Sequence, residues 1–178
     1  MGDAAEFFHP SLDCARVDSE QPRPGEGVEQ AGESRIGQPR DRVWRALNDP
    51  EVLARCLDGC KSMTAVGDGE YEAEVGAKVG PVKATFKAAI SLNDVVEPES
   101  YRLEVEVKGG AAGFARGSAS VNLEEVAGDD GDETLLTYRI NGNIGGKLAQ
   151  IGSRLVDAAA RKMAARFFER FKVDFDTA

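Results

Sequence analysis

Five successive segments between residues 71 and 140 alternate strictly between apolar and polar side chains, and no other feature constrains the fold as much. In the first segment, Tyr71, Ala73 and Val75 share one parity, whereas Glu72 and Glu74 take the other. Successive side chains of a β-strand point to opposite faces of its sheet. The alternation therefore predicts antiparallel strands with one face toward a core and one toward water. The later segments of this kind span residues 82–92, 101–108, 115–123 and 136–140.

The apolar face of such a sheet needs a cover, and residues 147–175 are predicted to supply it as one long amphipathic helix. Their apolar residues recur at spacings of three and four, which is the period of a helix with one apolar stripe. The stripe contains Leu148, Ile151, Leu155, Ala159, Met163, Phe167 and Phe171.

The segment before the alternation is predicted to add one weak strand and two short helices. Residues 28–36 form the strand, Pro39 opens the first helix, and Pro50 opens the second, which runs from Glu51 to Cys56. Residues 61–66 then form a hairpin with residues 71–79. We expect a single α+β domain over residues 28–175 and an irregular, proline-containing tail over residues 1–27.

The inward parity of the predicted sheet is rich in small residues. Ala73, Ala84, Ala88 and Ala119 take inward positions, and Ala159 lies on the helix stripe that faces them. Small residues on both sides of an interface indicate either close helix–sheet packing or a pocket for an apolar ligand. The pattern alone leaves both interpretations open.

Charge and cysteine content exclude several kinds of partner. The formal net charge of −9 disfavours nucleic acid. Three cysteines and one histidine show no ligand-like spacing, which argues against zinc and for a reducing compartment. No apolar run reaches about 18 residues and no secretory signal precedes the domain, so we expect a cytoplasmic protein.

The predicted long helix is basic although the chain is acidic. Residues 147–175 carry seven basic and three acidic residues. A basic face behind an apolar stripe is usual for a solvated helix, but it is also typical of a helix that touches an anionic membrane surface.

Catalytic groups are scarce on the inward parity. Tyr71, Tyr101 and Tyr138 are the protic residues there, and each lacks a charged partner nearby in the sequence. General acid–base or nucleophilic chemistry needs such partners within hydrogen-bonding reach. The sequence therefore predicts no catalytic residues, no resident cofactor and no metal.

The order of the elements is similar to that of the START/SRPBCC superfamily, in which a long C-terminal helix grips a curved seven-stranded antiparallel sheet. Four blocks narrow the resemblance to the CoxG family, the G subunit of carbon monoxide dehydrogenase, over about residues 28–172. The blocks are residues 43–60 (VWRALNDPEVLARCLDGC), 79–87 (VGPVKATFK), 108–119 (KGGAAGFARGSA) and 145–155 (GGKLAQIGSRL).

This resemblance implies a non-catalytic accessory protein of a molybdenum hydroxylase of the carbon monoxide dehydrogenase type. It also implies a role in maturation or membrane recruitment of that enzyme, with peripheral contact at the inner membrane face. Binding of the isoprenoid quinone that accepts the enzyme's electrons fits the hollow fold. Asp58 departs from the family pattern, since it stands where a proline is usual between the two cysteines.

Our first hypothesis is a lipid- or quinone-binding protein whose apolar ligand lies between the sheet and the long helix. The residues expected to line the ligand are Leu53, Leu57, Phe86, Phe114, Tyr138, Leu148, Ile151 and Leu155. The rival is a protein–protein adaptor or maturation factor with a filled core. A START-like enzyme acting on a small molecule is the third hypothesis.

Overall fold

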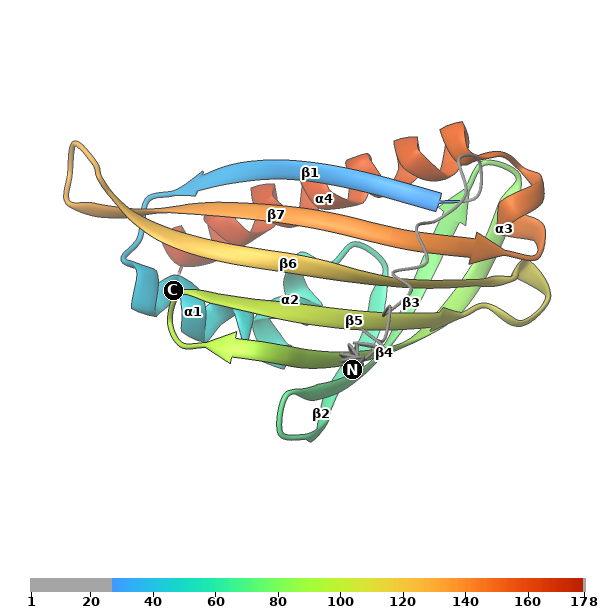
Figure 1. Cartoon of the computed structure of the whole chain (residues 1–178), viewed down its shortest axis with the longest axis horizontal. Coiled ribbons are helices and arrows are strands. Elements are labelled where there is room, and N and C mark those ends of the chain that lie inside the picture. The colour runs from blue at the N-terminus through green and yellow to red at the C-terminus, as the bar shows by residue number, and fades with distance from the viewer. Residues whose placement is uncertain (1–26, 178) are drawn as a thin grey trace, which may run out of the picture.

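A computed structural model describes residues 27–177, which form a seven-stranded antiparallel sheet with helices on one face (Figure 1). The strands are β1 (Gly27–Ile36), β2 (Cys60–Gly67), β3 (Glu70–Val79), β4 (Val82–Val96), β5 (Ser100–Lys108), β6 (Phe114–Ala127) and β7 (Asp132–Gly145). The helices are α1 (Arg40–Leu47), α2 (Pro50–Cys56), α3 (Lys147–Gln150) and α4 (Ser153–Thr177), with a 3-10 turn, η1 (Gly110–Ala112). The tail predicted for residues 1–27 lies, except for Gly27, outside the described residues.

The strand order is β1-β7-β6-β5-β4-β3-β2, so the two strands that flank α1 and α2 in the sequence lie at opposite edges of the sheet. Strands β2 to β7 follow one another as antiparallel neighbours, as the sequence predicts. β1 closes the other side by pairing with β7 along its whole length. In Figure 1, α1, α2 and α4 all lie behind the sheet, on the face that the apolar parity predicts.

The alternation in the sequence matches the burial of the strands. Tyr71, Ala73 and Val75 of β3 are buried, whereas the intervening Glu72 is exposed. The edge strand β2 is less regular, because its pairing with β3 shifts register after Cys60 and again after Ala65. Its side chains are mostly exposed.

The two short helices begin and end where the prolines and polar residues predict. Pro39 precedes α1, and Asn48 caps its C-terminus. Asp49 is the N-cap of α2, where its Oδ1 accepts a hydrogen bond from the main-chain N–H of Glu51 at 2.9 Å. This bond satisfies one of the free N–H groups of the first turn.

The prediction of one continuous helix over residues 147–175 is wrong at its N-terminal end. Helix α3 ends at Gln150, and Gly152 takes a φ of +95°, a left-handed conformation that an α-helix does not contain. Helix α4 begins at Ser153 and is 25 residues long, about 37 Å at the usual rise. The chain therefore changes direction between α3 and the long helix.

Two apolar clusters lie between the sheet and the helices. The larger one joins α1, α2 and the C-terminal half of α4 to the sheet, with Trp44, Leu136 and Phe171 among its buried members. The smaller one lies near η1 and α3 and is built on Phe86, Ala112 and Leu148. The sheet and α4 also enclose the candidate site.

Candidate ligand-binding cavity

An apolar cavity of about 390 Å³ lies between the sheet and α4. The sheet contributes Met63, Tyr71, Ile90, Leu92, Tyr101, Leu103, Ala119, Val121, Leu136, Tyr138 and Ile140. The helices and the residue after α2 contribute Leu47, Leu53, Leu57, Ala160, Met163, Ala164, Phe167 and Phe168. Its volume falls in the range of small-molecule pockets, which is about 300–1,000 Å³.

Small side chains on both walls leave this space open. Ala119 of β6 is buried at the sheet wall, and Ala160 and Ala164 of α4 stand at the helix wall. Elsewhere the small inward residues allow close packing, since Ala77 and Ala84 pack against the cluster of Phe86 and Leu148. Small residues thus accompany close packing at one end of the sheet and an open cavity at the other.

The polar groups of the cavity wall are phenols in apolar surroundings. Tyr71 donates a hydrogen bond from its hydroxyl to the main-chain oxygen of Asn48 at 3.1 Å. Tyr101 packs edge-to-face against Trp44 at 5.4 Å between ring centroids, and its burial raises the pKa of its hydroxyl. Tyr138 stacks on Phe168 at 5.3 Å. No lining residue among those described is a carboxylate, lysine, histidine or cysteine, so the wall offers contact surface rather than acid–base chemistry.

Three of the eight predicted lining residues stand at the cavity, namely Leu53, Leu57 and Tyr138. Phe86 and Leu148 are buried in the smaller cluster, and Ile151 packs against them. Because the chain turns at Gly152, the residues before it stay with η1 and the start of β4.

Phe114 and Leu155 are also away from the cavity, and each is nearly half exposed, at 47% and 46%. Phe114 begins β6 on the same parity as Arg116, which places it on the outer face of the sheet. Leu155 lies over the β3–β4 turn, where its Cδ1 would be 3.1 Å from a Cβ added to Gly80. A ligand-binding role for these residues stays a prediction.

The C-terminal half of α4 lines the cavity but is absent from the predicted lining residues, although the apolar stripe of the predicted helix includes it. Met163 and Phe167 belong to the three-and-four spacing that predicted the helix, and both line the cavity. Periodicity identified their face but not their position along the sheet.

Ion pairs join α4 to α2 beside Leu53 and Leu57. Asp58, the residue that departs from the family pattern, accepts hydrogen bonds from Arg166 and from Arg170, the latter at 3.1 Å. The bond from Arg166 lowers the pKa of the Asp58 carboxyl. Arg55 pairs with both carboxylate oxygens of Asp174 at 2.9 and 3.1 Å. These contacts fix α2 against the C-terminal half of α4.

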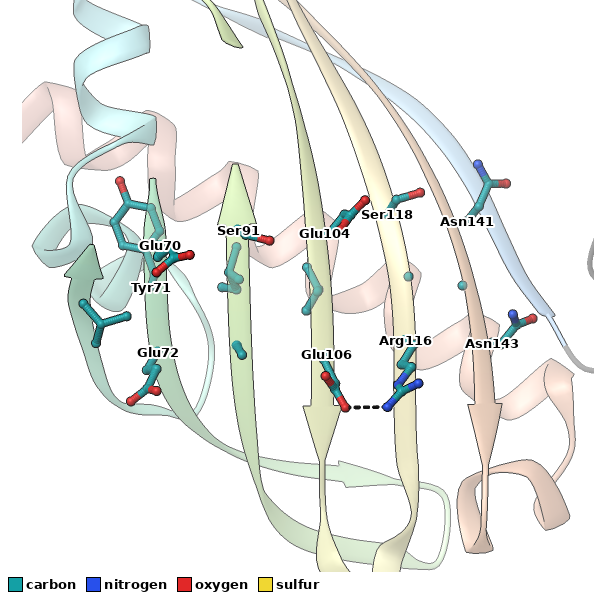
Figure 2. A pocket seen from close by; sticks show the side chains of 16 residues that line it. Glu70, Tyr71, Glu72, Ser91, Glu104, Glu106, Arg116, Ser118, Asn141 and Asn143 are labelled. Carbon is teal, nitrogen blue, oxygen red and sulfur yellow. Dashed lines mark hydrogen bonds and ion pairs between the residues drawn. The ribbon is translucent and has the colours of Figure 1, made fainter. Parts of the chain in front are cut away.

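A larger hollow, of about 790 Å³, lies on the outer face of the sheet, away from α4 (Figure 2). Figure 2 shows carboxylate, amide and hydroxyl side chains rising from neighbouring strands, with Glu106 bound to Arg116 at 2.8 Å. That bond lowers the pKa of the Glu106 carboxyl. Most of the hollow's polar lining belongs to the polar parity of the strands. Its lining mixes charged, amide and hydroxyl groups, whereas that of the inner cavity is apolar apart from three phenols.

A curved antiparallel sheet gripped by a long C-terminal helix defines the START-like class of helix-grip folds. A START superfamily protein from Mycobacterium smegmatis superposes with a TM-score of 0.62 at 11% identity, covering 86% of this chain and 99% of that one. The Zhui aromatase/cyclase from Streptomyces sp. R1128 gives 0.60 at 11% identity, covering 83% and 93%. At these identities the likeness concerns the fold.

A conserved protein from Geobacillus kaustophilus is more similar, with a TM-score of 0.77 and 29% identity over 84% of this chain and 96% of that one. The family model of CoxG, the G subunit of carbon monoxide dehydrogenase, matches residues 32–175. The chain therefore belongs to the CoxG family, as the four sequence blocks predicted. No curated protein matched the sequence.

Residues 27–177 contain neither a spanning helix nor a metal-ligand cluster. None of the helices there combines the length and the hydrophobicity that crossing a bilayer demands. In the same residues, no three histidine, cysteine, aspartate or glutamate side chains group as metal ligands would.

Proposed function

We propose that this CoxG-family chain is a non-catalytic accessory protein that carries an apolar molecule, an isoprenoid quinone, in the cavity between the sheet and α4. The observation that carries the proposal is the cavity itself, whose described lining is apolar apart from three phenols. Buried apolar surface is the main source of affinity for such ligands.

The size of the cavity limits how much of a quinone it can hold. At about 30 Å³ for each water-sized group, 390 Å³ has room for roughly a dozen non-hydrogen atoms. This is about two isoprene units or one substituted ring, so a longer prenyl chain extends beyond the cavity.

The proposed partner is an enzyme of the carbon monoxide dehydrogenase type, since the family carries the name of that enzyme. We also propose peripheral contact with a membrane, where quinones are dissolved. The exposed face of α4 supports this, because it carries Arg154, Arg161, Lys162 and Lys172. Each basic residue near an anionic surface contributes about 1 kcal/mol of attraction. The cytoplasmic location expected from the sequence stays a prediction.

The two alternatives differ in what the cavity does. As an adaptor, the protein would bind the dehydrogenase and leave the cavity without a ligand. As an enzyme it would resemble the aromatase/cyclase among its structural neighbours, but the cavity wall supplies no nucleophile or base among the described residues.

The chain's single tryptophan allows a direct binding test. Trp44 is buried against Tyr101, which lines the cavity, so a quinone bound there should quench its fluorescence. We suggest titration with a benzoquinone that carries a ten-carbon tail. Saturable quenching at one molecule per chain, counted by native mass spectrometry, is the expected result.

Two phenylalanine substitutions on α4 form a matched pair for this titration. Ala164→Phe places a ring in the cavity, whereas Ala158→Phe places the same ring on the exposed face of the helix. Ala164→Phe should weaken binding about tenfold or more, a change of about 1.4 kcal/mol. Ala158→Phe should bind as the unmodified protein does. Equal quenching in all three proteins would exclude the cavity as the site and leave the adaptor hypothesis.

A further inference from the structure

The inward face of β1 carries two buried polar residues, where the inward faces of the neighbouring strands are mostly apolar. Gln30 and Ser34 occupy inward positions and are each only 7% exposed. The amide Nε2 of Gln30 donates a hydrogen bond to the main-chain oxygen of Asp157 on α4 at 3.0 Å. This contact places the polar strip of β1 directly against the long helix.

A second pocket, of about 400 Å³, follows this contact between β1 and α4. Its walls include Gln30, Glu33 and Ser34 from β1 and Arg161 and Phe168 from α4. Unlike the apolar cavity, it presents amide, hydroxyl and charged groups. Glu33 and Arg161 carry opposite charges.

Tyr138 and Phe168 line both this polar pocket and the apolar cavity. Their rings stack at 5.3 Å with 25° between planes, and so they form the partition between the two spaces. The hydroxyl of Tyr138 reaches β1 at Gly32, where an added Cβ would lie only 2.5 Å from Oη. Glycine at this position therefore leaves room for a phenol hydroxyl at the polar side of the partition.

One buried polar atom beside this pocket has no partner. Within residues 27–177, the Oδ1 of Asp157, whose main-chain oxygen binds Gln30, accepts no hydrogen bond. Buried polar groups in proteins are nearly always hydrogen-bonded, and those left over mark positions where water or a ligand completes the network.

We infer that the pocket between β1 and α4 is the head-group subsite for a ligand whose tail lies in the apolar cavity. The inference rests on the proposed function and deepens it by defining the ligand class. The head is polar and carries a hydroxyl or carbonyl oxygen, because the pocket offers hydrogen-bond donors and acceptors. The tail is apolar, and it passes the partition when the Phe168 ring turns away from Tyr138.

Competition against the quenching quinone tests this inference with simple probes. The probes are 1-dodecanol and dodecane, which share a chain and differ in the hydroxyl head. The double variant Ser34→Ala/Tyr138→Phe removes two hydroxyls from the pocket, and Ser118→Ala removes one from the outer face of β6 as a control.

In the unmodified protein, 1-dodecanol should compete more strongly than dodecane. The double variant should weaken 1-dodecanol roughly two- to tenfold for each hydroxyl that it loses. Dodecane should be unaffected, and Ser118→Ala should change neither probe. Equal affinities of the two probes in the unmodified protein, or an unchanged 1-dodecanol affinity in the double variant, would overturn the subsite.

A dodecyl probe with a diazirine on its head carbon gives an independent readout on the unmodified protein. Photolabelling should modify β1 near Ser34 or α4 near Arg161. Labelling of residues 57–63 instead would refute the assigned position of the head. Failure of the proposed function would give a different result. Neither probe would compete with the quinone, and Ala164→Phe would show the same quenching as the unmodified protein.

Discussion

Phe171→Ala should destabilise the protein more than most single substitutions, because Phe171 holds α4 to the larger apolar cluster. Its side chain is 0% exposed. It stacks on Phe167 at 5.7 Å and meets Phe175 edge-to-face at 5.1 Å. Core Phe→Ala changes cost about 3–5 kcal/mol, and each aromatic pair adds about 0.5–1.5 kcal/mol beyond area burial. The measured range for Phe→Ala already contains such contacts, so the loss of two pairs places the expected cost in its upper part, at about 4–5 kcal/mol.

For a domain of this size, each kcal/mol lowers Tm by about 2–4 °C, so the variant should melt roughly 8–20 °C lower. Urea unfolding followed by circular dichroism and by Trp44 fluorescence measures the free energy directly. Val173→Ala is the matched control, because Val173 lies two residues away on α4 and is 53% exposed. It should change stability by no more than about 0.5 kcal/mol. A loss below about 1 kcal/mol for Phe171→Ala would refute the described packing of α4.

Two further predictions concern the segment that joins α2 to β2. Burial raises the pKa of the Cys56 thiol to about 11 and also raises that of the half-buried Cys60. Since the thiolate is the reactive form, Cys60 should alkylate before Cys56 near pH 8, and peptide mapping that finds the reverse order would contradict this. The pKa of the Asp58 carboxyl is lower in the folded protein than in the unfolded chain, so its pairing with Arg166 stabilises the folded state at pH values above the unfolded-state pKa. This stabilisation is lost as the pH falls through the folded-state pKa. Asp58→Asn should therefore lower Tm at pH 7 but match the unmodified protein near about pH 2, whereas a constant gap between the two melting curves would show another cause.

The strands were predictable because a sheet with one solvent-exposed face produces a strict alternation of apolar and polar residues along each strand. The pairing of β1 with β7 is different. It joins segments about a hundred residues apart in the chain, and no local pattern encodes which edge β1 occupies. The place of β1 in the sheet could be expected only from the resemblance of the element order to a known fold.

The position of the cavity was only partly predictable. Periodicity says which side chains face the sheet, so it found the stripe that includes Met163 and Phe167, but it does not say where along the sheet they lie. The break at Gly152 sets where α4 begins and therefore where its side chains lie along the sheet. From the sequence alone, a glycine in a helical pattern can equally be a small packing residue. Phe114 was different, since its parity with Arg116 already indicated the outer face.

The sequence contains a pattern that indicates the polar pocket, although the prediction of the first strand did not use it. Gln30 and Ser34 share the parity of Ile36, which is buried, so a polar inward strip could be read from residues 28–36. The weak amphipathic pattern of this segment reflects that strip.

The irregular pairing of β2 has a consequence for how such a protein stays dispersed. An edge strand exposes unpaired N–H and C=O groups, which can recruit the edge of another molecule and start aggregation. In β2, register shifts after Cys60 and Ala65 interrupt this row of groups, and the exposed Lys61 adds a charge. A broken, charged edge of this kind keeps neighbouring copies from joining their sheets into a larger one.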